Sequence, residues 1–337
     1  MNYSTFDKSL KEEYKKILIE EQFGEMPEAP VSICANIKRE YSDFAGKALV
    51  REYFVRAQLK SGEKLNFPLT TYFPINAKNN KTVILVNNED TIPSKFCPIE
   101  EIIDRGWNVA NFNFLRFVDN SGRLDYENNK ILIKKYPDSG KMLFWAWAIS
   151  RAREFLASLE EVDEKNIGVV GNERAGRIAL ATASFDEKIA FVHANCSGTA
   201  GACLYESQTD QSQSIENVIM WFGWAFNNKF HEYFKTGKKR PFDQHLLGYL
   251  IAPRPLSVGC ASEDLFTNPT GSFDFCKAVS NAYESYGEKG LVAPKEFVVG
   301  EKYHDGKVGY YCRKGTHFFG REDWNNMLDF FDKNLNK

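Results

Sequence analysis

The sequence lacks long apolar runs, is poor in histidine and has no paired cysteines. It contains 5 His and 7 Cys in 337 residues, and no two cysteines form a CxxC pair. This spacing predicts neither a zinc site nor a disulfide framework. No stretch is apolar over the length that a bilayer-spanning helix needs. Residues 1–8 also lack the apolar centre of a signal peptide, so we expect a cytoplasmic protein without a membrane segment.

An excess of one charge is also missing. The formal net charge is -2 at pH 7, and 43% of the residues are hydrophobic. Without a basic excess the sequence predicts no nucleic-acid partner. Nothing in it indicates a cofactor or a metal. The expected partner is a small-molecule or carbohydrate-derived substrate, and the oligomeric state is not indicated.

The hydrophobic period changes along the chain. Alternation predicts antiparallel strands at 31–39, 49–59 and 64–73 after a helix at 6–22, with a hairpin at 61–63. Later, short apolar runs alternate with helical patterns, which is typical of an α/β fold with a mostly parallel sheet. The predicted strands are 83–86, 107–114, 167–171, 189–196, 256–262, 297–299 and 308–311, and the predicted helices are 99–105, 142–159, 175–185, 272–286 and 322–334.

Two long connections interrupt this alternation. Residues 115–140 are polar and irregular, and we expect a loop there. The segment 198–250 contains Trp221 and several phenylalanines, and it is too long for a simple connection. We therefore expect a single domain spanning 1–337, in which 198–250 is a cap-like insertion over the strand ends.

The stretch 167–180 has the layout of a nucleophile elbow, the strained strand–turn–helix of the α/β-hydrolase fold. A β-branched run ends at Gly171, and a helix rich in small residues follows Arg174. Gly171 and Ala175 provide the small side chains that this tight turn needs on both sides of its apex. The apex, however, is Glu173, which has no hydroxyl or thiol.

Two further loops are expected at the same sheet edge, where sites form in open α/β folds. One follows the strand 256–262 and carries Glu263 and Asp264, of which Asp264 is the preferred acid. The other carries His317. The order apex, acid, histidine is that of an α/β-hydrolase triad. The alternatives are that the two carboxylates are solvated loop charges and that His317 caps the last helix.

Several blocks, in the same order along the chain, resemble the glucuronoyl esterase family and its acetylxylan-esterase-like relatives. The resemblance covers about residues 15–335. The blocks are Gly24-Glu25-Met26-Pro27, the elbow Gly171 to Arg177, Asn195-Cys196-Ser197-Gly198, Asp243-Gln244-His245, Ala252-Pro253-Arg254-Pro255, Ser262-Glu263-Asp264-Leu265-Phe266 and Gly315-Thr316-His317.

The resemblance implies specific roles. Arg174 matches an arginine that stabilises the oxyanion, and Arg177 matches a lysine that contacts the sugar acid. His317 matches the catalytic histidine, and Asp264 matches one of the family's two acid positions. At the other acid position stands Cys196, which cannot serve as a triad acid. Three further residues are expected at the substrate cleft, namely Gln244, Phe266 in place of a tryptophan, and Trp221 in the insertion.

Glu173 stands where the family has its nucleophilic serine, so it cannot form an acyl-serine. We expect a hydrolase of a small or sugar-linked ester in which Glu173 is a carboxylate nucleophile or a general base. One alternative is a catalytically inactive relative that binds a carbohydrate or small ligand in the cleft. Another is a family esterase whose serine was replaced, with Cys196 or Ser197 as a less favoured nucleophile.

Overall fold

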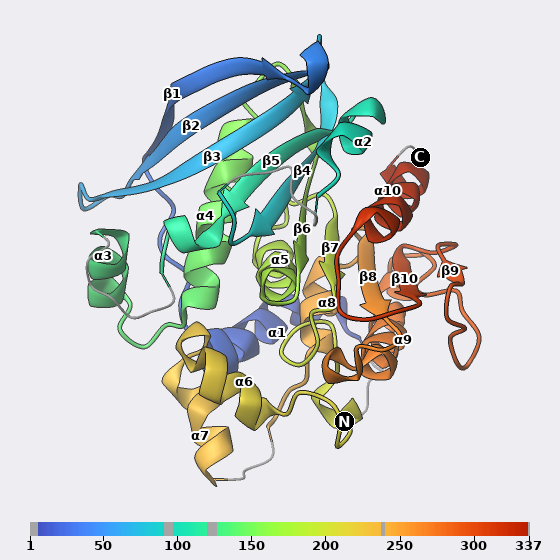
Figure 1. Ribbon diagram of the computed structural model, residues 1–337. Helices are drawn as coiled ribbons and strands as arrows, with labels where there is room; N and C mark the ends of the chain where they lie inside the picture. Colours follow the sequence, from blue (N-terminus) through green and yellow to red (C-terminus); the bar gives the residue numbers. More distant parts are fainter. Residues whose placement is uncertain (1–5, 91–96, 120–126, 237–239, 336–337) are drawn as a thin grey trace.

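A mixed β-sheet with helices on both faces forms the body of the protein (Figure 1). The computed structural model describes residues 6–90, 97–119, 127–236 and 240–335. Within them the sheet has 10 strands, in the order β1-β2-β3-β5-β4-β6-β7-β8-β10-β9. The strands are β1 Ser32–Asp43, β2 Ala48–Gln58, β3 Lys64–Pro74, β4 Asn80–Asn87, β5 Asn108–Asn113, β6 Val162–Asn172, β7 Val192–Asn195, β8 Leu256–Ala261, β9 Lys302–Tyr303 and β10 Val308–Arg313.

The central strands are parallel and buried on both faces. Each strand in the series β5-β4-β6-β7-β8-β10 pairs parallel with its neighbour. Every residue of β5, β7, β8 and β10 is buried. β8 and β10 are mostly apolar because helices cover both faces of the sheet, whereas β5 and β7 also bury asparagines, among them Asn111 and Asn195. The carboxyl ends of the parallel strands meet along one edge, and this edge carries the candidate site.

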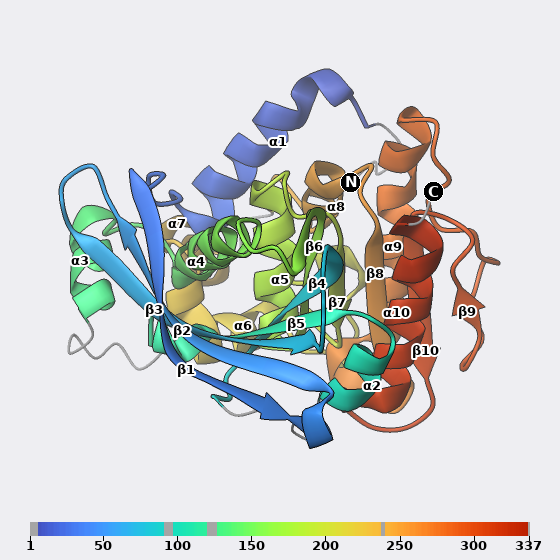
Figure 2. The same ribbon diagram turned by 90° about the horizontal axis from the view of Figure 1, so that it is seen from above.

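Helices pack on the two faces and enclose two hydrophobic cores (Figure 2). One core lies against α1, α4, α5, α8 and α9, and the other lies against α2 and α10. The α-helices are α1 Lys11–Leu18, α2 Ile99–Asp104, α3 Glu127–Lys135, α4 Lys141–Leu156, α5 Arg174–Phe185, α6 Ile215–Phe222, α7 Asn228–Thr236, α8 His245–Ile251, α9 Pro269–Ser285 and α10 Arg321–Leu335. The α/β prediction is confirmed.

The N-terminal part adds an antiparallel extension to the sheet. Strands β1, β2 and β3 pair antiparallel, and β3 continues antiparallel onto β5. The tight β2–β3 connection, in which the N–H of Gly62 donates to the carbonyl of Leu59, confirms the predicted hairpin. The alternating pattern of β2 reflects one face packed on the core and one face turned outward.

Two sequence predictions were wrong. The stretch 115–140 was expected to be a loop, yet it contains the helix α3, in which Leu132 is fully buried. Tertiary burial of that residue outweighs the polar local sequence. Residues 297–299 were expected to form a strand, but they lie outside the sheet. Val298 and Val299 are exposed there, while Phe297 packs edge-on against Tyr310.

The segment 198–250 is mostly helical and contains α6, α7 and α8. The rings of Phe222 and Trp224 lie over the guanidinium of Arg174 at the start of α5. This segment therefore packs against the elbow, although its role as a cap stays a prediction. No helix in the described residues is long and apolar enough to cross a membrane.

Gly171 is a strict requirement of the turn between β6 and α5. A Cβ at this position would lie 2.3 Å from the backbone carbonyl of Ala175. We expect Gly171→Ala to lower the free energy of unfolding by about 2–3 kcal/mol, because strand and helix must separate. Urea denaturation measures this change.

Gly62 provides the control for Gly171→Ala. It has a positive φ, of 92°, but no atom lies within 4 Å of the position that a Cβ would take at its hairpin. Gly62→Ala therefore adds backbone strain without a clash and should cost about 1 kcal/mol. Equal losses in the two variants would contradict the close approach of β6 and α5.

Candidate active site

The chain turns sharply at Glu173, between β6 and α5. Glu173 has φ 54° and ψ -117°, a conformation that non-glycine residues rarely adopt. Its N–H donates to the carbonyl of Asn195 at 2.9 Å, and its carbonyl accepts from the N–H of Arg177 at 3.1 Å. These bonds hold the strained residue at the edge of the sheet. The first N–H groups of α5, which have no partner within the helix, begin directly after it.

Asp264 and His317 meet at the same edge from two other loops. Asp264 follows β8, and His317 follows β10. The Nδ1 of His317 donates to Oδ2 of Asp264 at 2.6 Å, and the hydroxyl of Thr267 donates to the same oxygen at 2.7 Å. The side chain of Asp264 is only 6% exposed, whereas that of His317 is 41% exposed. A buried acid thus orients a solvent-accessible imidazole, as in a hydrolase triad.

The pair changes the pKa of both partners. The hydrogen bond to Asp264 raises the pKa of His317 above 6.5, burial opposes this change, and the charge of Glu173 adds to it. Burial tends to raise the pKa of Asp264, but the hydrogen bonds from His317 and Thr267 outweigh it and lower that pKa below 3.8. The interaction therefore stabilises the fold fully between pH 3.8 and 6.5. It weakens as the pH rises through the folded pKa of His317, and it is lost as the pH falls through the lowered pKa of Asp264.

A pocket of about 350 Å³ opens at the carboxyl ends of β4 and β6. Glu173 and His317 both face it, together with Arg174 and Asn172. The remaining lining residues are Leu85, Val86, Asn87, Asn88, Glu89, Cys97, Phe114, Ala175 and Phe319. The pocket is thus part apolar and part polar, which suits a small organic substrate.

The carboxylate of Glu173 has no hydrogen-bond partner among the residues that the structure describes. Its charge affects three neighbours. It adds to the raised pKa of His317, and it opposes the burial that lowers the pKa of Arg174 and Arg177. The Nε2 of His317 lies 3.5 Å from Nδ2 of Asn172, which is a long contact. The carboxylate of Glu173 is therefore open to a ligand in the pocket, and a ligand that reaches Nε2 of His317 must displace the long contact with Asn172.

Arg174 lies beside Glu173 with its guanidinium stacked on Phe222, 4.2 Å from the ring centroid. Burial lowers the pKa of Arg174, and the neighbouring charge of Glu173 opposes this effect. Its Nε is buried without a hydrogen-bond partner among the described residues. A stacked, partly desolvated cation at the pocket wall can stabilise negative charge on a bound substrate.

Arg177 and Gln244 were expected to contact the substrate, but neither lines the pocket. Arg177 is 2% exposed and donates from Nε to the carbonyl of Ser197 at 2.8 Å and from Nη2 to Oε1 of Gln213 at 2.6 Å. Gln244 is fully buried and donates to Oε1 of Gln22 at 2.8 Å. Arg177 is thus held behind the elbow by the segment after β7, whereas Gln244 joins the start of α8 to Gln22 near the N-terminus.

Trp221 and Phe266 lie together outside the pocket lining. Their ring centroids are 5.9 Å apart, and the rings are 48% and 42% exposed. Phe266 follows Asp264 closely in the chain and Trp221 lies in the last turn of α6, so this exposed pair links the segment 198–250 to the acid loop. Their predicted contact with substrate stays a prediction.

Cys196 sits next to the triad pair, at the bend directly after β7, where it has a positive φ of 41°. The expectation that Cys196 does not lie at a strained turn was therefore wrong. Sγ of Cys196 and the ligand atoms of Asp264 and His317 lie within 4.8 Å of one another. Burial raises the pKa of the Cys196 thiol well above its usual value, so the thiolate is disfavoured. Asp264 and His317 already use these atoms in a hydrogen bond with each other. The expectation of a site without a metal stays a prediction.

Two asparagines at this edge were not assigned roles from the sequence. Asn172 ends β6 and Asn195 ends β7, and Nδ2 of Asn195 donates to Oδ1 of Asn172 at 2.9 Å. In the sequence, the feature that could have indicated a role for Asn172 and Asn195 is that each is the last residue of a strand next to the predicted site.

Fold and site together define an α/β-hydrolase whose elbow carries a carboxylate. The sequence matches the family model "Glucuronyl esterase, fungi" over residues 58–287, which is more than half of the chain. The chain belongs to this glucuronyl esterase family.

Individual relatives agree with the family model. The chain is 29% identical to "Carbohydrate esterase MZ0003" from an unknown prokaryotic organism over 70% of its length, and 26% identical to "4-O-methyl-glucuronoyl methylesterase" of Schizophyllum commune over 60%. These matches cover 56% and 57% of the two relatives, so the chain spans just over half the length of each.

The fold is also that of solved family structures. A glucuronoyl esterase from Solibacter usitatus superposes with a TM-score of 0.86 at 23% identity, covering 98% of this chain and 94% of that chain. A CE15 esterase from a marine bacterial metagenome gives a TM-score of 0.85 at 21% identity, covering 96% of this chain and 91% of the other. At this identity the likeness concerns the fold, and it confirms the α/β-hydrolase architecture.

Replacing the acid should change the titration of His317. We expect Asp264→Asn to lower the pKa of His317, because the hydrogen bond to the Asp264 carboxylate, the largest raising effect, is lost. NMR titration of the imidazole measures this. Glu263→Gln is the matched control, since Glu263 is the exposed carboxylate next to it. Equal shifts in both variants would contradict the assignment of Asp264 as the acid.

Proposed function

We propose that this protein hydrolyses a sugar-linked carboxylic ester, with Glu173 as general base and His317 as general acid. The observation that carries the proposal is the hydrogen-bonded Asp264–His317 pair in one pocket with a carboxylate that has no partner among the described residues. The family supports the substrate class, because its relatives are named for esters of glucuronic acid.

The two protonation states suit this division of roles. Asp264 and Glu173 raise the pKa of His317, which favours an imidazolium that can donate a proton from Nε2. A carboxylate base needs no prior deprotonation near neutral pH, unlike a serine hydroxyl. With a serine at the apex, the histidine would start as the proton acceptor. With Glu173 there, the carboxylate starts as the proton acceptor and His317 starts as the proton donor.

The reaction balances without a cofactor. Glu173 takes a proton from water while the water oxygen bonds to the ester carbonyl carbon. The first N–H groups of α5 and the guanidinium of Arg174 stabilise the resulting oxyanion. The bond from the carbonyl carbon to the alcohol oxygen then breaks, and the alcohol oxygen takes a proton from Nε2 of His317. The acid and the alcohol leave, and solvent returns the enzyme to its starting state.

A direct attack by Glu173 on the carbonyl carbon is less favourable. Even with His317 protonating the leaving alcohol, this attack would convert the ester into a mixed anhydride, which is a higher-energy acyl species that water must then hydrolyse. Water delivered by the carboxylate avoids this intermediate. The general-base route therefore requires fewer unfavourable steps in this pocket.

A second candidate is a non-catalytic protein that binds a sugar acid in the pocket. The contact between Nδ2 of Asn172 and Nε2 of His317, at 3.5 Å, favours this alternative. Asn172 can occupy Nε2, which is the atom that donates the proton in the catalytic proposal. Against it stands the length of that contact, which a substrate can displace. Ligand binding without turnover would support this alternative.

Glu173 variants test the proposal on the methyl ester of glucuronic acid and on a simple aryl ester. We expect Glu173→Gln to lower kcat at least 10²-fold, about the contribution of a general base. Glu89→Gln, which changes another carboxylate of the same pocket, should alter KM at most. Turnover by Glu173→Ser alone would contradict the proposal and indicate that the native chain has lost the family reaction.

The pH profile gives an independent test. Native activity should fall as the pH rises through the raised pKa of His317, because the general acid loses its proton. Glu173→Ser needs a neutral histidine to activate the hydroxyl, so its activity should rise with pH. This rise should lie at lower pH than the fall of the native curve, because the charge of Glu173 no longer raises the pKa of His317. Stopped-flow or plate assays from pH 5 to 9 measure both curves. A native curve that rises above pH 6.5 would exclude His317 as the acid.

A further inference from the structure

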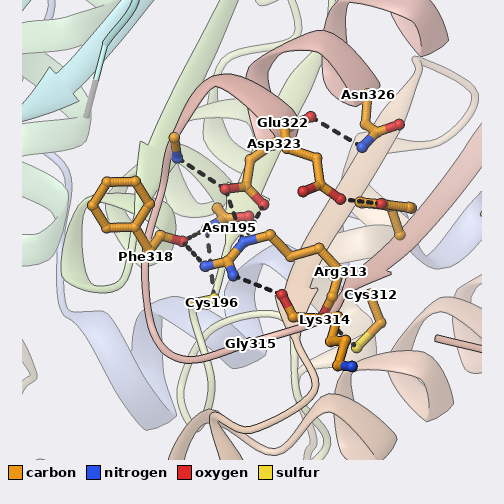
Figure 3. Close-up of polar contacts among 12 residues, drawn as sticks. Asn195, Cys196, Cys312, Arg313, Lys314, Gly315, Phe318, Glu322, Asp323 and Asn326 are labelled. Atoms are coloured by element: carbon orange, nitrogen blue, oxygen red, sulfur yellow. Dashed lines mark hydrogen bonds and ion pairs between the residues drawn. The ribbon is translucent and has the colours of Figure 1, made fainter. Parts of the chain in front are cut away.

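The loop that carries His317 is wrapped around one side chain, that of Arg313 (Figure 3). Nη2 of Arg313 donates to the carbonyls of Thr316 at 2.7 Å and Phe318 at 2.9 Å, which lie on either side of His317. Nη1 donates to the carbonyl of Lys314 at 3.2 Å. One guanidinium thus binds three carbonyls of an otherwise irregular loop.

Arg313 itself is fixed by Asp323 at the start of α10. Nε of Arg313 lies 3.1 and 3.2 Å from the two carboxylate oxygens of Asp323, and the N–H of Gly320 donates to the same group at 2.9 Å. Both side chains are buried, being 7% and 3% exposed. Because an unpaired charge would be costly there, the ion pair keeps the guanidinium in place.

Asn195 connects this loop to the elbow. Its Nδ2 donates to the carbonyl of Phe318 at 3.2 Å and to Oδ1 of Asn172 at 2.9 Å. The carbonyl of Asn195 accepts the N–H of Glu173. A single residue at the end of β7 therefore contacts both segments that bring the reacting side chains together, and Figure 3 shows it pointing at the backbone of Phe318.

The other end of the Asn195 amide reaches a small internal cavity. Burial lowers the pKa of His193 to about 3, and a hydrogen-bond interaction with the side chain of Asn195 opposes this effect, so the two side chains face each other. Within the described residues, Oδ1 of Asn195, Nε2 of His193 and Oδ1 of Asn326 are buried and none has a partner at full hydrogen-bond geometry. All three residues line a cavity of about 10 Å³, roughly the space that one water molecule needs. Gly259 makes room for the amide, because a Cβ there would lie 2.2 Å from Oδ1 of Asn195.

We propose that Asn195 and Arg313 are positioning residues that clamp the loop 314–320 between Asp264 and the elbow, with a buried water completing the hydrogen bonds of Asn195. The proposal rests on the proposed function only in assigning His317 the role of acid. In this proposal, the imidazole of His317 reaches Asp264 because hydrogen bonds from Asn195 and Arg313 to the loop backbone fix the loop. Neither residue touches the substrate.

Asn195→Ala tests the clamp, and Asn326→Ala is its matched control. Both variants remove a buried amide at the same cavity, but only Asn195 contacts the loop 314–320. We expect both to lower the melting temperature. Only Asn195→Ala should shift the NMR-measured pKa of His317 toward 6.5 and speed amide exchange at 314–320. An unchanged pKa, or equal shifts in the two variants, would overturn the proposal.

Arg313→Lys decides the question if Asn195→Ala does not fold. Lysine keeps the charge beside Asp323, but a point-like ammonium cannot reproduce the planar fork that binds the carbonyls on both sides of His317. The pKa of His317 should again fall toward 6.5, and a native value would reject the clamp.

Turnover separates this proposal from the proposed function. If the native protein hydrolyses the methyl ester of glucuronic acid, both clamp variants should lower kcat with little change in KM. If the native protein has no activity, the proposed function fails, while the titration of His317 still decides whether the clamp exists.

Discussion

The close approach of β6 and α5 at Gly171 is the constraint on which the site depends. The Cβ that Gly171 lacks would fall 2.3 Å from the Ala175 backbone, so the chain must reverse within very few residues. This reversal forces Glu173 to a φ of 54°. As a result its carboxylate and the first N–H groups of α5 are directed at one pocket, where the loops after β8 and β10 deliver the acid and the histidine.

In the proposed mechanism, the acid and the histidine act together with a carboxylate at the apex instead of a serine. Asp264, Thr267 and His317 form a chain of short hydrogen bonds, and the loop behind them is fixed by the buried Arg313–Asp323 pair. A serine at the apex would need His317 as a base. A carboxylate raises the pKa of the same histidine and favours its use as an acid. In the proposed mechanism, replacing serine by glutamate at the apex therefore turns His317 from a proton acceptor into a proton donor, while Asp264 and the loop around His317 stay in place.

Much of this arrangement could be predicted from the sequence because its signals are local. The β-branched run before Gly171 and the small residues after Glu173 predicted the elbow, and the apolar runs predicted the parallel strands. The helix α3 was missed because the burial of Leu132 is decided by distant residues. The burial of Arg177 and Gln244 was missed for the same reason. The bridging role of Asn195 depends on where Phe318 and Asn172 meet in space, which no local pattern reveals.

The most direct test of the account is intact-mass spectrometry of the native protein, quenched while it hydrolyses the methyl ester of glucuronic acid. If Glu173 is a general base, free acid accumulates and the protein keeps its unmodified mass throughout. An acyl adduct on Glu173 would contradict the base role, and the absence of any product would contradict catalysis at this site.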